Sequence, residues 1–318
     1  MFPPELVDLL LDFVHSDSTT LSACTLVCRY WLPSARFHLL SQLALDSASV
    51  ESFLDDLDDI DTGSLGNVTS LRIEGLDLST APVALPHAFP NLQSLCLEAF
   101  EANSFFVIAT WISGIPSLRS LKLSGDWDGD DIVTLPMLAT VPKLSHLDLN
   151  CPLRVILGWF LTLEVVPVAS SLVLRDIWGE ESPAISRYLA ATGASLDSLV
   201  LVYPRKEVLP LDLTHNVNVR SLSFECYAHA MPRIVCETLV GSGRENLETL
   251  HMNVLGVPPG FPTETDISEW HRVNTTISAL QFPRLRSIQL QGLQYGGTRV
   301  TQLLPIQIGA AIVASRDL

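Results

Sequence analysis

Positive charge is scarce in this chain of 318 residues. It holds 19 Lys and Arg against 35 Asp and Glu, which gives a net charge of −16 at neutral pH. The basic residues form no run along the sequence. Nucleic-acid binding depends largely on neutralising phosphates, so we expect no nucleic-acid partner.

Long apolar runs are missing as well. The nearest candidate, residues 152–169, carries Arg154 and Glu164 and falls short of the roughly 20 apolar residues that span a membrane. The N-terminus lacks the basic region and apolar stretch of a signal peptide. We therefore expect no membrane partner and a cytoplasmic or nuclear location. The six irregularly spaced cysteines would remain reduced thiols there.

Signatures of catalysis, cofactor binding and metal binding are also missing. The chain contains no G-x-S-x-G, G-x-G-x-x-G, H-E-x-x-H or C-x-x-C motif. Cys24 and Cys28 lie four residues apart, but no second pair with zinc-site spacing accompanies them. Residues 126–131 resemble a calcium loop, yet Asp131 and Met137 stand where an EF-hand needs Gly and Glu. We expect no cofactor, no metal and no enzymatic activity.

What the chain does contain is a repeated phrase, L-x-x-L-x-L, as in Leu118-Arg-Ser-Leu-Lys-Leu. Nine copies align on their middle apolar residue: Leu71, Leu95, Leu121, Leu147, Leu172, Leu199, Leu222, Leu250 and Ile288. Successive copies are 24, 26, 26, 25, 27, 23, 28 and 38 residues apart. This period is typical of leucine-rich repeats.

Alternation within the phrase predicts an α/β fold. In a strand, the middle apolar residue and the one two positions later point inward, and the residues between them point outward. One repeat cannot bury its own apolar row, so the repeats must stack into a solenoid with a parallel sheet on its concave face. The position five after the middle residue is Phe100, Asp126, Ile177 or Tyr227 instead of the usual Asn. We therefore expect helical crossovers, near residues 101–113, 152–166, 186–191 and 267–273.

The first forty residues stand apart from the repeats and predict three short helices. Pro3 or Pro4 opens the first helix, whose apolar face would hold Leu6, Leu10, Phe13 and Val14. Ser18, Thr19 or Thr20 would cap the second helix, and the third would run through Tyr30 and Trp31 to about Leu40. Three short helices make a core near the lower limit for independent folding, so a partner surface is expected.

Two motifs in this region resemble the F-box family: Phe2-Pro3-Pro4-Glu5-Leu6 and Val27-Cys28-Arg29-Tyr30-Trp31. The first carries Phe where the family usually has Leu, and Thr20-Leu21 replaces the usual Asp-Leu. The resemblance implies docking to the Skp-type adaptor of a cullin–RING ubiquitin ligase, and through it to the cullin. The residues it points to are Pro3, Pro4, Leu6, Val27 and Trp31. In proteins that join an F-box to leucine-rich repeats, the repeats receive the protein substrate.

These patterns divide the chain into four parts. Residues 1–45 are the F-box, 46–66 an acidic linker or N-terminal cap, 67–293 the leucine-rich repeats and 294–318 a C-terminal cap. The acidic part holds seven Asp and Glu and no Lys or Arg. We interpret it as a solvated helix and loop; contact with a basic partner is the alternative.

One group of outward positions differs from the rest, because Val173, Val200 and Val202 would stand together on the exposed side. Such a group is typical of an interface centre, and we expect the substrate there. The alternative is a loop, residues 203–216 or 256–266, folded over the valines.

The function predicted is the substrate-recognition subunit of a Skp–cullin–F-box ubiquitin ligase. The alternative is a repeat scaffold that acts outside a ligase.

Overall fold

The computed structural model describes residues 3–14, 17–56, 65–79, 85–129, 142–204, 211–240, 245–256, 263–280, 282–292, 294–295, 298–299 and 311–312. The chain divides into two compact units, Met1–Pro142 and Lys143–Leu318.

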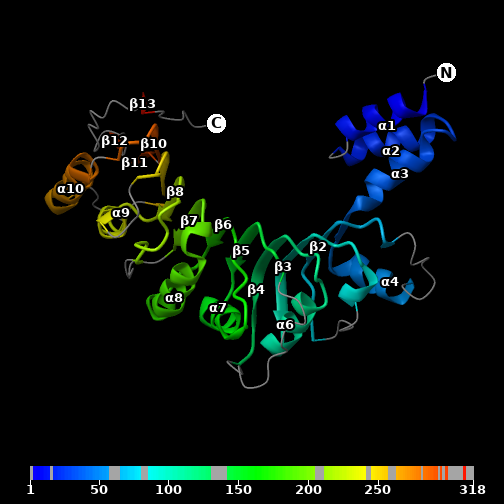
Figure 1. Cartoon of the computed structure of the whole chain (residues 1–318), viewed down its shortest axis with the longest axis horizontal. Coiled ribbons are helices and arrows are strands. Elements are labelled where there is room, and N and C mark those ends of the chain that lie inside the picture. Colours follow the sequence, from blue (N-terminus) through cyan, green and yellow to red (C-terminus); the bar gives the residue numbers. More distant parts are fainter. Residues whose placement is uncertain are drawn as a thin grey trace. The chain divides into compact units, whose positions relative to one another are not determined.

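The first unit joins a helical N-terminal part to parallel strands (Figure 1). Its helices are α1 (Pro4–Phe13), α2 (Ser18–Val27), α3 (Leu32–Ser41), α4 (Ser47–Asp56), the 3-10 turn η1 (Leu85–Ala88) and α6 (Phe105–Ser113). Its strands are β1 (Gln42–Leu45), β2 (Ser70–Glu74), β3 (Ser94–Ala102) and β4 (Ser120–Trp127). The strands pair in chain order, and every pair is parallel.

The second unit repeats a strand and a crossover along the chain. Its parallel strands are β5 (His146–Asn150), β6 (Ser171–Leu174), β7 (Ser198–Tyr203), β8 (Ser221–Cys226), β9 (Thr249–Val254), β10 (Ser287–Gly292) and β13 (Ala311–Ile312). Its helical segments are α7 (Leu153–Thr162), η2 (Gly179–Glu181), α8 (Ser182–Thr192), η3 (Gly193–Ser195), α9 (Met231–Val240) and α10 (Glu264–Leu280). A separate antiparallel pair joins β11 (Gln294–Tyr295) to β12 (Thr298–Arg299).

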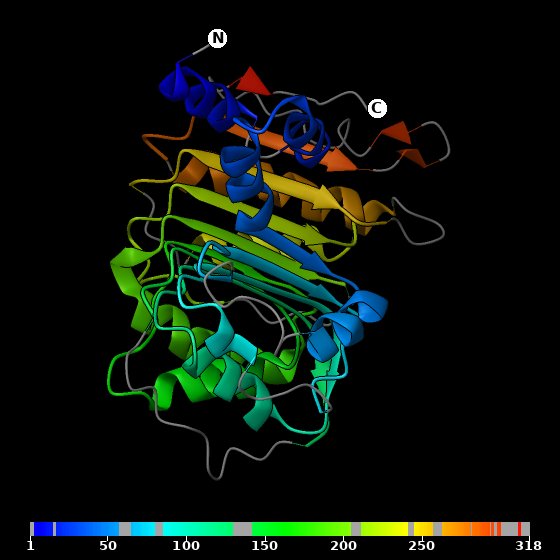
Figure 2. The ribbon, with the colours of Figure 1, turned by 90° about the vertical axis from the view of Figure 1, so that its right-hand side faces the viewer.

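The strand register places equivalent positions of successive repeats side by side, as the ladder of strands in Figure 2 illustrates. Leu71, Leu95 and Leu121 are partners in the first unit. In the second unit the partners run from Leu147 through Leu172, Leu199, Leu222 and Leu250 to Ile288. All of these side chains are buried. The parallel sheet and its inward apolar rows are therefore confirmed, and they are consistent with a solenoid-like repeat fold.

Asparagine ties neighbouring repeats together at the start of the phrase. The side-chain amides of Asn91, Asn218 and Asn246 donate to the carbonyls of Gly66, Ala194 and Val217 at 2.8, 2.8 and 2.9 Å. Each acceptor belongs to the preceding repeat, so these bonds satisfy turn carbonyls that no strand pairs. No Asn stands five positions after the middle apolar residue. The three Asn residues that link neighbouring repeats lie four positions before it.

The crossovers agree with the sequence in four places. Helices α6, α7 and α8 cover residues expected to be helical, and α10 contains the expected segment 267–273. Helix α9 forms the crossover between β8 and β9, for which the sequence predicted no helix. The acidic segment 46–66 begins with α4, whose first turn is capped because the Ser49 amide donates to Asp46 Oδ1 at 2.8 Å. Residues 57–64 of that segment, and much of 256–266 and 294–318, lie outside the described residues.

Candidate functional site

Proline residues and one side-chain cap mark the starts of the three N-terminal helices. Pro3 precedes α1 and Pro4 is its first residue, where a proline loses no helical hydrogen bond. Asp17 caps α2, because its carboxylate accepts from the amide of Thr20 at 3.0 Å and from its hydroxyl at 2.6 Å. The predicted caps Ser18, Thr19 and Thr20 therefore lie inside α2. Pro33 lies in the first turn of α3, so it starts this helix.

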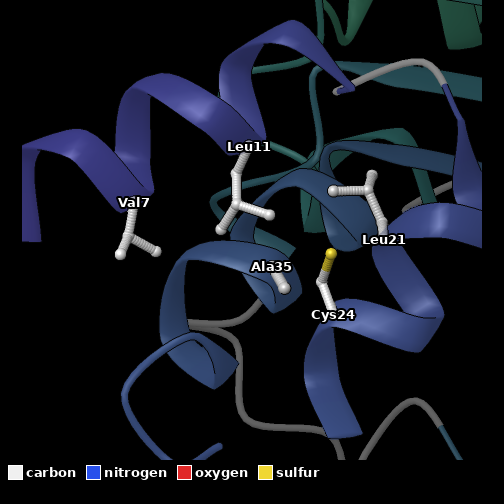
Figure 3. Packing of buried hydrophobic residues seen from close by; sticks show 5 residues of the cluster. All are labelled: Val7, Leu11, Leu21, Cys24 and Ala35. Carbon is white, nitrogen blue, oxygen red and sulfur yellow. The ribbon is translucent and has the colours of Figure 1, made fainter. Parts of the chain in front are cut away.

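A small apolar cluster holds α1, α2 and α3 together. Its buried members are Val7, Leu11, Leu21, Cys24 and Ala35, which point toward one another in Figure 3. Val14, Trp31 and Leu39 pack against them and are partly buried. Two polar contacts join α1 to α3 at the rim: Ser34 Oγ donates to Asp8 at 2.5 Å, and His38 Nε2 lies 3.1 Å from Asp12 Oδ1. Five buried side chains are a small core for three helices.

Helix α1 carries two apolar stripes, and only one of them faces this cluster. Val7, Leu11 and Val14 form the buried stripe, at positions i, i+4 and i+7. Leu6, Leu10 and Phe13 have the same spacing, roughly a quarter turn away, and are exposed, Phe13 to 78%. The prediction that Leu6, Leu10, Phe13 and Val14 share one apolar face therefore holds only for the first three, because Val14 belongs to the buried stripe.

The other two helices and the turn between them add to this exposed stripe. We call the exposed large apolar side chains of the first forty residues the N-terminal apolar surface: Leu6, Leu9, Leu10, Phe13, Leu26, Val27, Tyr30, Phe37 and Leu40. The apolar side chain of Leu26 is 86% exposed. So many exposed apolar side chains in so short a segment are typical of a protein interaction site.

The residues singled out from the sequence fall into two groups here. Pro3, Leu6 and Val27 are exposed, whereas Trp31 packs against the helical cluster. Pro4 opens α1. Leu9, Leu10, Phe13 and Leu26 are exposed as well, although the two motifs did not predict them as contact residues. The i, i+4, i+7 spacing of Leu6, Leu10 and Phe13 was the signal, because it duplicates a stripe that already supplies a core.

The outward valines of β6 and β7 are not an exposed group. Val173 pairs in register with Val200 as expected, but Val173 is 7% exposed, Val202 is 9% exposed and Val200 is half-buried. Adjacent strands are only about 4.8 Å apart, so side chains on one face cover their neighbours. The prediction that these three valines form an exposed group was therefore wrong. Residues 205–210, which belong to the loop proposed to cover them, lie outside the described residues.

Ion pairs cross the outward face of both units. In the first unit, Glu98 accepts from Lys122 Nζ at 2.5 Å and also contacts Arg72. The hydrogen bond from Lys122 holds the pKa of Glu98 below its ordinary value. In the second unit, Asp148 pairs with Arg175 at 2.9 Å and is buried. This hydrogen bond raises the pKa of Arg175 above its ordinary value.

A cavity of about 420 Å³ opens at the carboxyl ends of β2, β3 and β4. It is lined by Asp77, Ser79, Glu101, Ala102, Asn103, Asp126, Trp127 and Asp128.

Within the part of the chain that the structure describes, no group of three or more His, Cys, Asp or Glu could hold a metal ion. Among the same described residues, no helix has the length and apolarity needed to cross a membrane.

Comparisons with known proteins give little beyond this geometry. No family model and no curated protein matches the chain. Among solved structures, a crystal structure of the Rad7 and Elc1 complex in yeast aligns over 99% of this chain and 89% of that chain. The sequence identity is 14% and the TM-score 0.36. A likeness this weak carries no argument about function.

Proposed function

We propose that this chain is the substrate-recognition subunit of a Skp–cullin–F-box ubiquitin ligase. The N-terminal helices would dock the Skp-type adaptor and, through it, the cullin. The stacked strands would be leucine-rich repeats that bind a protein substrate. The chain would carry out no chemistry itself, need no cofactor and act in the cytoplasm or nucleus.

One observation carries the proposal: the residues of the two motifs that resemble the F-box lie on or beside the N-terminal apolar surface. Leu6 of the first motif and Val27 of the second are exposed, and Tyr30 lies between Val27 and Trp31. Trp31 packs from the second motif onto the core, so one motif supplies both contact and support. The small core supports the proposal further. An adaptor that covered the exposed apolar side chains would stabilise the helices by about 25 cal/mol for each Å² of apolar surface buried.

Adaptor retention tests the proposal directly. The full chain is immobilised and incubated with a purified Skp-type adaptor, and the bound adaptor is measured. We expect the intact chain to retain the adaptor. Leu10→Glu with Phe13→Glu should weaken retention at least about tenfold, because charges would enter a desolvated contact. Both side chains are exposed, so the variant should keep the thermal unfolding midpoint of the parent.

A matched control places the same substitution on exposed apolar residues elsewhere. Phe106→Glu on α6 and Val240→Glu on α9 change exposed side chains and should leave retention unchanged. If the intact chain fails to retain the adaptor, the ligase role is wrong and the scaffold alternative replaces it. Equal losses in the test and control variants would show that retention is not specific to the N-terminal helices.

A further inference from the structure

The cavity at the carboxyl ends of β2, β3 and β4 is made by three segments that are distant in sequence. Asp77 and Ser79 follow β2, Glu101 to Asn103 end β3 and continue past it, and Asp126 to Asp128 do the same for β4. The segments meet because residues that follow parallel strands gather at one edge of the sheet. The volume of about 420 Å³ lies within the usual range of ligand pockets, about 300–1,000 Å³.

The charge of the lining has one sign. Asp77, Glu101, Asp126 and Asp128 contribute four carboxylates, and no Lys or Arg is among the lining residues. The carboxylates of Asp77 and Asp126 accept from the backbone amides of Ser79 and Trp127, at 2.9 and 2.8 Å. Arg72 and Lys122, on the adjoining sheet face, both contact Glu98. Charge complementarity therefore favours a cationic ligand.

Trp127 gives a second and independent indication of a ligand. Its side chain is 7% exposed, and it lines the cavity. It packs against Phe105 with the ring centroids 5.0 Å apart. Its indole Nε1–H makes no hydrogen bond to a described residue, and it is not among the fully buried donors without a partner, so it is open at the cavity wall. A Trp side chain that is largely buried but keeps its N–H open at a cavity wall can donate to a ligand acceptor there, and a peptide carbonyl is such an acceptor.

We infer that this cavity binds a basic segment of a protein substrate, with an Arg or Lys side chain inserted among the four carboxylates. The indole N–H of Trp127 donates to a backbone carbonyl of the same segment. Arg suits the site better than Lys, because its planar guanidinium can donate to two acceptor oxygens at once. This inference rests on the proposed substrate-receptor role and names the chemical class of the substrate.

Binding of defined peptides to the full chain tests the inference. The probes are fluorescein-labelled Gly-Ser peptides that carry Arg residues, and the same peptides with citrulline, which is uncharged, at those positions. Fluorescence anisotropy should show saturable binding of the Arg peptide and binding at least about tenfold weaker for the citrulline peptide, as loss of a charge-assisted contact predicts. Raising the salt concentration should weaken only the Arg peptide.

Two variants locate the binding site. Glu101→Gln with Asp128→Asn removes two carboxylates that accept no hydrogen bond from the described residues, so the fold should be kept and Arg-peptide binding should fall about tenfold or more. Trp127→Phe keeps an aromatic ring against Phe105 and should weaken binding a few-fold through the lost N–H. The matched control, Glu180→Gln with Glu264→Gln, removes two exposed charges outside the cavity and should leave binding unchanged.

Each outcome decides the question. Equal binding of the Arg and citrulline peptides, no binding of either, or full binding by the Glu101→Gln, Asp128→Asn variant overturns the inference. The measurement needs no adaptor. Arg-specific binding by a chain that fails to retain the adaptor would therefore keep this site and discard the ligase role, and the reverse result would do the opposite.

Discussion

Phe100 occupies the space that a side chain on Gly125 would need. A Cβ on Gly125 would lie 2.3 Å from the carbonyl oxygen of Phe100 and 2.7 Å from its ring carbons. The two residues pair across β3 and β4, directly after a shift in register between Glu98 and Phe100. At that shift Ala99 has a φ of 50°. The bulge therefore turns Phe100 into the core, where only glycine fits opposite it.

We predict that Gly125→Ala destabilises the first unit by about 1–3 kcal/mol or more, because backbone must move to admit the methyl group. Urea denaturation followed by tryptophan fluorescence measures this change. The control is Gly158→Ala in α7, where a Cβ meets nothing within 4 Å. It should be neutral or stabilising by up to about 1 kcal/mol, since alanine favours helix. Equal effects of the two substitutions would contradict the steric explanation.

A second prediction concerns pH. Lys122 donates to Glu98, and together with Arg72 it holds the pKa of Glu98 below its ordinary value in the folded chain. A depressed carboxyl pKa contributes stability that is present above the ordinary pKa and is lost as pH falls through the folded pKa. Lys122→Met should therefore reduce the loss of stability between neutral and acid pH.

The measurement for this pair is the free energy of unfolding across the acid range. Lys143→Met, at an exposed lysine of the second unit, is the control and should retain the pH dependence of the parent. A Lys122→Met curve that runs parallel to the parent curve would show that the contact does not control the titration of Glu98.

A third prediction follows from the valines of the outward sheet face. Val202 is 9% exposed and lies beside Glu225 in the strand register. Val202→Asp would bury a carboxylate next to another acidic residue, and we expect a loss of about 3 kcal/mol or more. Val165→Asp changes an exposed valine and should cost less than about 0.5 kcal/mol. A Val202→Asp chain as stable as the parent would restore the exposed surface that the sequence predicted.

The parallel sheet and its register follow from local features of the amino-acid sequence. The period near 25 residues and the alternation within each phrase are local properties, so the phrase alone aligns Leu71, Leu95 and Leu121. Proline likewise marks the starts of α1 and α3, whereas α2 is capped by Asp17 and not by one of the residues predicted from the sequence. The F-box resemblance also rests on short motifs, which need no contact between distant residues.

Which side chains are covered depends instead on how distant segments pack. Helix α1 has two equally spaced apolar stripes, and the packing of α2 and α3 selects Val7 and Leu11 for the core. Val173 and Val202 are buried, although the alternation within their phrases places them on the outward side of the sheet. The cavity joins Asp77, Glu101 and Asp126, because strands some 25 residues apart end at one sheet edge. Burial and convergence depend on contacts between distant residues, and periodicity alone does not encode them.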